Sequence, residues 1–154
     1  MILAIDPGCT ESAYALLRED LSPASFGKIY NVDMLEVILD KYYEHLAIEM
    51  VASYGMAVGK EVFDTVFWIG RFWEIARNTD CKYMQFIYRK DEKMNLCHNM
   101  KANDSNIRQA LIDRFGVVGT KKAPGWFYGV SKDVWAAIAV GVTYHDVYLQ
   151  EIGA

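Results

Sequence analysis

The amino end of the chain places a single acid at the end of an apolar run. Residues 1–8 read MILAIDPG, so Asp6 follows a segment suited to a buried strand and directly precedes a Pro-Gly turn. A carboxylate at the end of a buried strand is costly unless a metal ion or a partner charge compensates it. Asp6 is therefore the first candidate for a metal ligand.

Two further acids stand at the boundaries of apolar segments. Residues 45–50 read HLAIEM, in which Glu49 is the only acid, and Asp133 opens a long apolar segment typical of a helix. Because the three acids lie far apart in the sequence, we expect a fold that brings them to one point. Taken singly, each acid could instead be a helix cap or a surface charge.

Length and composition indicate one folded domain over residues 1–154, because the chain is long enough to bury a continuous core. The hydrophobic share of 53% excludes a disordered tail. No apolar run approaches the roughly 18 residues of a membrane span, and no basic residue precedes the apolar start as it does in a secretory signal. Three cysteines without CxxC spacing favour a reducing cytoplasm.

Charge is unevenly distributed along the chain, although the net charge is only −4. Residues 1–59 carry 3 basic and 9 acidic side chains, whereas residues 60–133 carry 13 basic and 9 acidic ones. Contacts with phosphate groups need local positive charge rather than a basic chain. The middle segment could therefore bind nucleic acid, and a solvated surface of mixed charge is the alternative.

Apolar periodicity and turn signals predict an α/β domain with one mixed five-stranded sheet flanked by helices. Strands are expected at 2–6, 13–17, 25–32, 45–50 and 82–88. Helices are expected at 34–43, 60–78, 105–115 and 132–149, with polar, basic and loop segments at 89–104 and 116–129. Expected helix caps are Asp33, Asp104 or Ser105, and Ser131.

The expected helix at 60–78 has apolar residues on more than one stripe, so it must bury two faces. The core would cover one face, and a second subunit would cover the other. A helix wholly buried in the core is the alternative.

Three segments in order carry a resemblance to a known family. They are ILAIDPG, then AIEM with a glycine-bounded loop and helix, and the closing KDVWAAIAVGVTYH. Together they resemble the RuvC family of Holliday-junction resolvases, which has the RNase H-like fold. The stretches IEMVASYGMAVGKEVF and KAPGWFYGVSKDVWAAIAV are similar to the small RuvC-like resolvases of bacteriophages, which act in the host cytoplasm.

The resemblance implies that Asp6, Glu49 and Asp133 are catalytic ligands of Mg²⁺, with Mn²⁺ as a substitute and two ions in each site. Two such ions can activate water and shield the leaving oxygen of a phosphodiester. The family usually has a further acid at the position of Val130. Either three carboxylates suffice with water, or another acid such as Glu11 or Asp104 contributes.

The resemblance also implies that Lys93 and Lys101 face the scissile phosphate. Residues that would extend the DNA contact are Tyr54, Arg89, Lys90, Arg108, Lys121, Lys122 and Lys132. Tyr54 is the local substitute for an aromatic wedge that would fall near Ala52. Each lysine could instead be a solvated loop residue, and the aromatic triplet at 126–128 could stack on a base or pack in the core.

The resemblance therefore implies a structure-selective DNA endonuclease that resolves four-way junctions and other branched DNA as a homodimer and leaves 5′-phosphate ends. A looser branch-cutting or debranching activity belongs to the same class. A junction-binding protein without catalysis is one alternative. An RNase H-like ATPase domain is another, suggested by the Asp-Pro-Gly turn, but it would need further glycine-rich phosphate loops.

Overall fold

A computed structural model describes residues 1–150 and contains one mixed five-stranded sheet with helices on both faces. The strands are β1 (Ile2–Asp6), β2 (Glu11–Leu17), β3 (Pro23–Tyr30), β4 (His45–Met50) and β5 (Tyr83–Tyr88). Their order in the sheet is β3-β2-β1-β4-β5. The first three strands form an antiparallel meander, and β4 and β5 run parallel to β1. This is the RuvC/RNase H-like fold, which confirms the predicted fold class.

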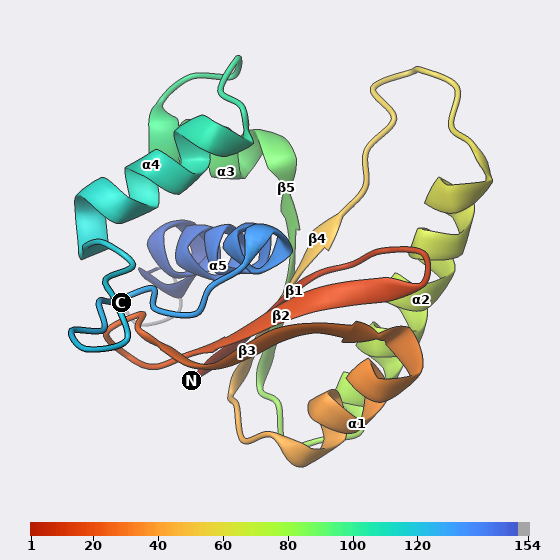
Figure 1. Ribbon diagram of the computed structural model, residues 1–154. Helices are drawn as coiled ribbons and strands as arrows, with labels where there is room; N and C mark the ends of the chain where they lie inside the picture. Colours follow the sequence, from red (N-terminus) through yellow and green to blue (C-terminus); the bar gives the residue numbers. More distant parts are fainter. Residues whose placement is uncertain (151–154) are drawn as a thin grey trace.

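The helices are α1 (Asn31–Asp40), α2 (Lys60–Arg77), α3 (Arg89–Cys97), α4 (Asp104–Phe115) and α5 (Lys132–Tyr144), followed by a π-helical turn, η1 (His145–Leu149). Helices α1 and α2 cover one face of the sheet, and α5 covers the other with α3 and α4 beyond it (Figure 1). Among residues 1–150, no helix is both long and apolar enough to cross a membrane.

Alternation along the strands decides which residues face which helices. Ile5 of β1 belongs to the core under α1 and α2, whereas Ala4 belongs to the core under α5. Asp6 follows Ala4 by two residues, and Glu49 follows Ala47 by two, so both acids lie on the face of the sheet that α5 covers. The same alternation that builds the two cores therefore directs both acids to the α5 side.

Small residues allow α5 to lie close to the sheet. A Cβ atom built on Gly141 would lie 2.5 Å from Leu17 Cδ1 and 3.0 Å from Ala4 Cβ. Both neighbours belong to the buried core. The close approach of α5 to β1 and β2 therefore depends on glycine at position 141.

The first helix starts earlier than the sequence predicts. The expected strand at 25–32 ends at Tyr30, and α1 begins at Asn31 rather than residue 34. The Asn31 side chain is buried, accepts a hydrogen bond from Ser12 and donates one to the Gly8 carbonyl. These long-range bonds fix the start of the helix, so the expected N-cap at Asp33 is wrong.

The polar segment at 89–104 contains a helix, α3, that hydropathy did not predict. The caps differ as well, because Asn103, and not Asp104 or Ser105, caps α4 through a reciprocal capping box with Asn106. Ser131 holds the N-cap position of α5 without a side-chain hydrogen bond. The last predicted helix ends as an α-helix at Tyr144, before η1.

A charged cluster ties α3 and α4 to η1. Asp146 accepts two hydrogen bonds from the Arg114 guanidinium, at 2.6 and 3.0 Å, and one from Asn95 at 2.8 Å. Burial opposes ionisation of Asp146, but hydrogen bonds from Arg114, Asn95 and His145 outweigh it and lower its pKa to about 2. This cluster holds α3 in place independently of the sheet.

Replacing Gly141 with alanine is expected to lower the free energy of unfolding by about 1–3 kcal/mol, because the added methyl group crowds Leu17 and Ala4. The matched control is Gly70→Ala on the exposed side of α2, where an added Cβ meets nothing within 4 Å. That control should raise stability by up to about 1 kcal/mol through helix propensity. Urea unfolding measures the free energy of unfolding of both variants. Equal changes in the two variants would contradict the close packing of α5.

Asp146→Asn is expected to lower the free energy of unfolding by about 1–2 kcal/mol at pH 7, given that Arg114 is partly exposed. The folded pKa lies below the unfolded value, so this stabilisation is complete above pH 4 and is lost as the pH falls toward 2. The difference between wild type and variant should therefore shrink by about half at pH 3. A difference in unfolding free energy that stays constant between pH 7 and pH 3 would contradict this account.

Candidate active site

Two of the predicted acids meet at the carboxyl edge of the parallel strand pair. Asp6 ends β1, and Glu49 is the penultimate residue of β4. The parallel register pairs Ile5 with Ile48, so Asp6 and Glu49 follow as neighbours one residue later. Both side chains are partly buried and lie on the α5 side of the sheet.

The third predicted acid, Asp133, lies in the first turn of α5. Asp133 and Asp6 line one open cavity of about 510 Å³. The Asp133 carboxylate accepts a hydrogen bond from Lys28 of β3 at 2.7 Å, and both side chains are partly exposed. Lys28 was not among the predicted site residues, because only the cross-sheet alignment of β3, β2 and β1 brings it there.

Glu92 is the acid that sequence reasoning missed. It lies in α3, which starts directly after β5, and its side chain is fully buried. No hydrogen-bond donor in the described chain reaches either of its carboxylate oxygens. The Glu92 carboxyl instead lies beside that of Glu49, close enough to share a proton with it. Helical spacing could have indicated that Glu92 is buried, because it precedes Leu96 by four residues and Leu96 packs against the core.

Crowding of acids dominates the electrostatics of this region. Burial, the charge of Glu49 and a hydrogen bond with Glu49 raise the pKa of Asp6 to about 8. Burial and the hydrogen bond and charge of Glu49 likewise raise the pKa of Glu92 well above its usual range. In the metal-free protein, ionisation of Asp6 is therefore incomplete at neutral pH, and Glu92 is harder to ionise than an exposed glutamate.

Arg89 is a cation beside this group of acids. Its guanidinium forms an ion pair with Asp104 and lies 3.8 Å from Glu92 Oε1. The charge of Arg89 partly offsets the rise in the pKa of both Asp6 and Glu92. Arg89, predicted as a DNA contact, is thus engaged by acids of this site, and Asp104 lines the cavity beside Asp6.

The donor set fits a hard divalent cation in its chemistry. Every candidate ligand is a carboxylate oxygen, the class that Mg²⁺ and Mn²⁺ prefer. Oε1 of Glu49 and both oxygens of Glu92 are buried without a hydrogen-bond partner. Within residues 1–150, no three acidic, histidine or cysteine side chains already surround a common point as a cation site requires. The acids are neighbours that a cation would have to draw together.

The other predicted site residues divide into two groups. Arg108 and Lys132 line the same cavity as Asp6 and Asp133, and the Arg108 guanidinium lies over the Trp135 ring. The remaining ones do not line that cavity; they are Tyr54, Lys90, Lys93, Lys101, Lys121 and Lys122. Lys93 is partly buried, and the others of this group are exposed.

The aromatic segments also differ in their surroundings. Tyr54 stands in the exposed loop 51–59 with a left-handed backbone, φ 51°, and 66% of its surface is accessible. In the triplet at 126–128, Phe127 is fully buried and Trp126 stacks on Phe115. Only Tyr128 of the triplet is substantially exposed, so core packing accounts for the other two.

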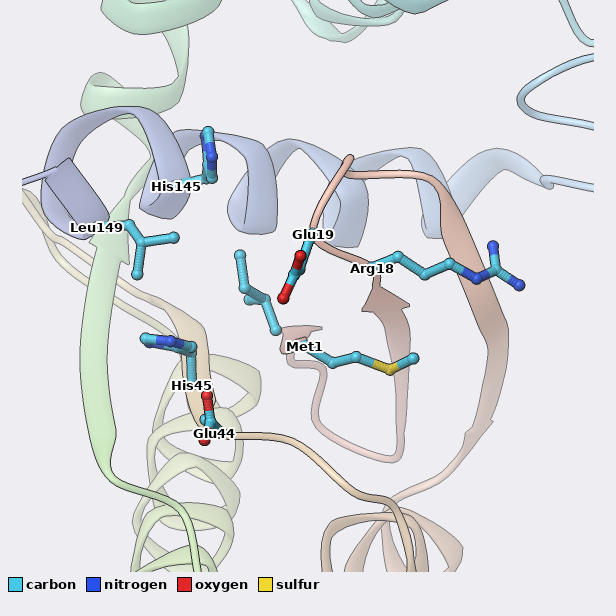
Figure 2. Close-up of a pocket in the computed structure, with 8 residues that line it drawn as sticks. Met1, Arg18, Glu19, Glu44, His45, His145 and Leu149 are labelled. Carbon is cyan, nitrogen blue, oxygen red and sulfur yellow. The ribbon is translucent and has the colours of Figure 1, made fainter. Parts of the chain in front are cut away.

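A second cavity, of about 260 Å³, lies at the opposite end of the strands (Figure 2). It is lined by Met1, Ile2, Arg18, Glu19, Glu44, His45, His145 and Leu149. His45 begins β4, whereas Glu49 stands near its end. The second cavity is therefore separate from Asp6, Glu49 and Asp133.

Comparison with known proteins gives a structural likeness without a sequence match. No protein-family model matches the sequence, and no curated protein matches it. The Thermus thermophilus RuvC structure superposes with a TM-score of 0.69 at 15% identity, covering 97% of this chain and 95% of that one. T. thermophilus RuvC in complex with a Holliday junction substrate superposes with a TM-score of 0.71 at 15% identity, covering 97% and 94%. The chain is thus structurally similar to the Holliday-junction resolvase RuvC over nearly its full length.

Proposed function

We propose that the protein is a Mg²⁺-dependent endonuclease that cuts branched DNA, four-way junctions above all. One observation carries the proposal. Asp6 and Glu49 at adjacent strand ends and Asp133 at the head of α5 lie on one side of the sheet, where the cavity of Asp6 and Asp133 is also lined by Arg108 and Lys132. The likeness to a RuvC structure that holds a junction supports the choice of substrate.

Each acid has a role in this proposal. Asp6, Glu49 and Asp133 would hold two divalent cations, which when bound supply an activated water and shield the leaving 3′ oxygen. Lys28 keeps Asp133 facing the cavity in the metal-free protein. Because burial and mutual repulsion keep protons on part of the acid group, cation binding must be coupled to proton release.

Basic residues would hold the DNA. Arg108 and Lys132 stand at the cavity itself and can contact phosphates next to the cut. Lys93 and Lys101 would approach the scissile phosphate and stabilise its developing charge. Lys90, Lys121 and Lys122 would extend the contact along the backbone, and exposed Tyr54 could stack on an unpaired base at the branch point.

A junction-binding protein without catalysis is the second candidate. Val130, just before α5, lines the cavity and brings no acid to it. The basic residues around the cavity would serve such a protein equally well. Measurement of cleavage separates the two functions, because only the first requires the acids.

We further propose that the working form is a homodimer joined through α2. One face of α2 is buried in the core by residues that include Ile69 and Phe72, while Phe63 and Phe67 on another face are both 64% exposed. Arg71 lies over the Phe67 and Trp68 rings on that exposed face. A two-fold dimer would present two identical sites to a nearly symmetric junction and place paired nicks.

Asp6→Asn is expected to reduce nicking of a synthetic four-way junction in Mg²⁺ by more than about 100-fold, since it removes an oxygen ligand. Junction binding should stay within about threefold of wild type, because the basic residues are intact. Gel assays measure both, with product ends expected to carry 5′-phosphate. The control is Glu36→Gln, an exposed acid on α1, on the other side of the sheet. Binding by wild type without any Mg²⁺-dependent nicking would favour the second candidate.

Phe67→Asp is expected to convert a dimer to a monomer in analytical ultracentrifugation, because it places a charge in the apolar contact. Paired cleavage of both junction strands should then become two independent nicks. Tyr42→Asp serves as the control, since Tyr42 is 73% exposed and lies outside α2. A wild-type chain that sediments as a monomer at all concentrations would refute the dimer.

A further inference from the structure

The strongest unexplained feature of the described chain is the environment of Glu92. Its side chain has no exposed surface, yet no donor reaches either of its oxygens. The cation Arg89 is 3.8 Å away, which is too long for a hydrogen bond, and its guanidinium is also engaged by Asp104. A buried carboxylate left in this state is costly.

Residues other than Glu92 tie α3 to the rest of the fold. Asn95 of the same helix donates to Asp146, which also ties Arg114 of α4 to η1. Leu96 and Cys97 pack against the core under α5. A methionine or glutamine of similar size would fill the position of Glu92 without the cost of burying a carboxylate.

What Glu92 does contact is the candidate active site. Its carboxyl lies beside that of Glu49, and Glu49 in turn lies beside Asp6. The three carboxyl groups thus form a row that runs from α3 through β4 to β1. Arg89 lies 3.8 Å from Glu92 Oε1, and Lys28 pairs with Asp133. Arg108 and Lys132 line the cavity of Asp6 and Asp133.

We infer that Glu92 is a fourth carboxylate ligand of the divalent-cation site, supplied by α3. This inference rests on the proposed function and names a ligand that the sequence motifs did not contain. It explains both the burial of Glu92 and its lack of a donor, because an oxygen reserved for a cation has no other partner. It would also bring the number of carboxylate ligands to four, although Val130 before α5 contributes none.

Mn²⁺ binding tests the inference on the full-length, metal-free chain. Isothermal titration calorimetry with Mn²⁺ should show at least about tenfold weaker binding for Glu92→Gln than for wild type. Asp91→Asn is the matched control, because it removes the same charge from the adjacent position of the same helix. The control should bind Mn²⁺ within about twofold of wild type.

The melting temperature supplies a second readout. If Glu92 only stabilised the fold, replacing it would lower the melting temperature of the metal-free protein, whereas a cation ligand predicts no such loss. Without metal, Glu92→Gln and Glu92→Met should melt at or above the wild-type temperature, since each removes a buried acidic group that is crowded by Glu49 and whose oxygens receive no hydrogen bond from a donor of the described chain. Their rise in melting temperature on addition of Mn²⁺ should be smaller than that of wild type. Glu92→Met contains no oxygen ligand and carries the test if the amide variant folds poorly.

The outcomes separate this inference from the proposed function. Mn²⁺ binding by both Glu92 variants as tight as that of wild type would overturn the role of Glu92 and leave the nuclease proposal standing. Loss of folding in both variants would also overturn it, because Glu92 would then serve the fold. A wild-type chain that binds no Mn²⁺ would contradict the proposed function itself.

Discussion

Repulsion among buried carboxylates is the constraint on which the rest of this structure depends. The sheet places Asp6 beside Glu49, and α3 adds Glu92 to the same row. Water solvates these groups poorly, so without a cation the row retains protons, and the pKa of Asp6 reaches about 8. A protein that keeps such an arrangement gives up stability at this edge of the sheet, which is characteristic of a site built for a ligand.

The remainder of the fold supports that unfavourable arrangement. Close packing at Gly141 holds α5 on the sheet, so that Asp133 in its first turn faces the cavity of Asp6. The cluster around Asp146 ties α4 and α3, which carries Glu92 and Arg89, to η1. Strands therefore position Asp6 and Glu49, and helices held by contacts outside the site position Asp133 and Glu92.

The likeness to RuvC shows how little sequence identity this architecture requires. At 15% identity the two chains superpose over 97% of this one. In this chain the architecture rests on the alternation that builds two cores and on the meander followed by two parallel strands. The cavity of Asp6 is lined by Val130, whereas Glu92 is buried in α3 beside Glu49.

The order of strands and helices and the candidacy of Asp6, Glu49 and Asp133 could be predicted from the sequence, because alternation, helical periodicity and isolated acids at element ends are local signals. Helix α3, the start of α1 at Asn31, and the positions of Lys28 and Glu92 could not. Each of these depends on partners distant in sequence, such as Ser12 for Asn31 and Asp133 for Lys28. Glu92 looks like a solvated charge in a polar segment, and only tertiary packing buries it beside Glu49. Local sequence determined the elements and three of the acids, whereas burial and cross-sheet proximity, which arise only when the chain is folded, decided which charges share one site.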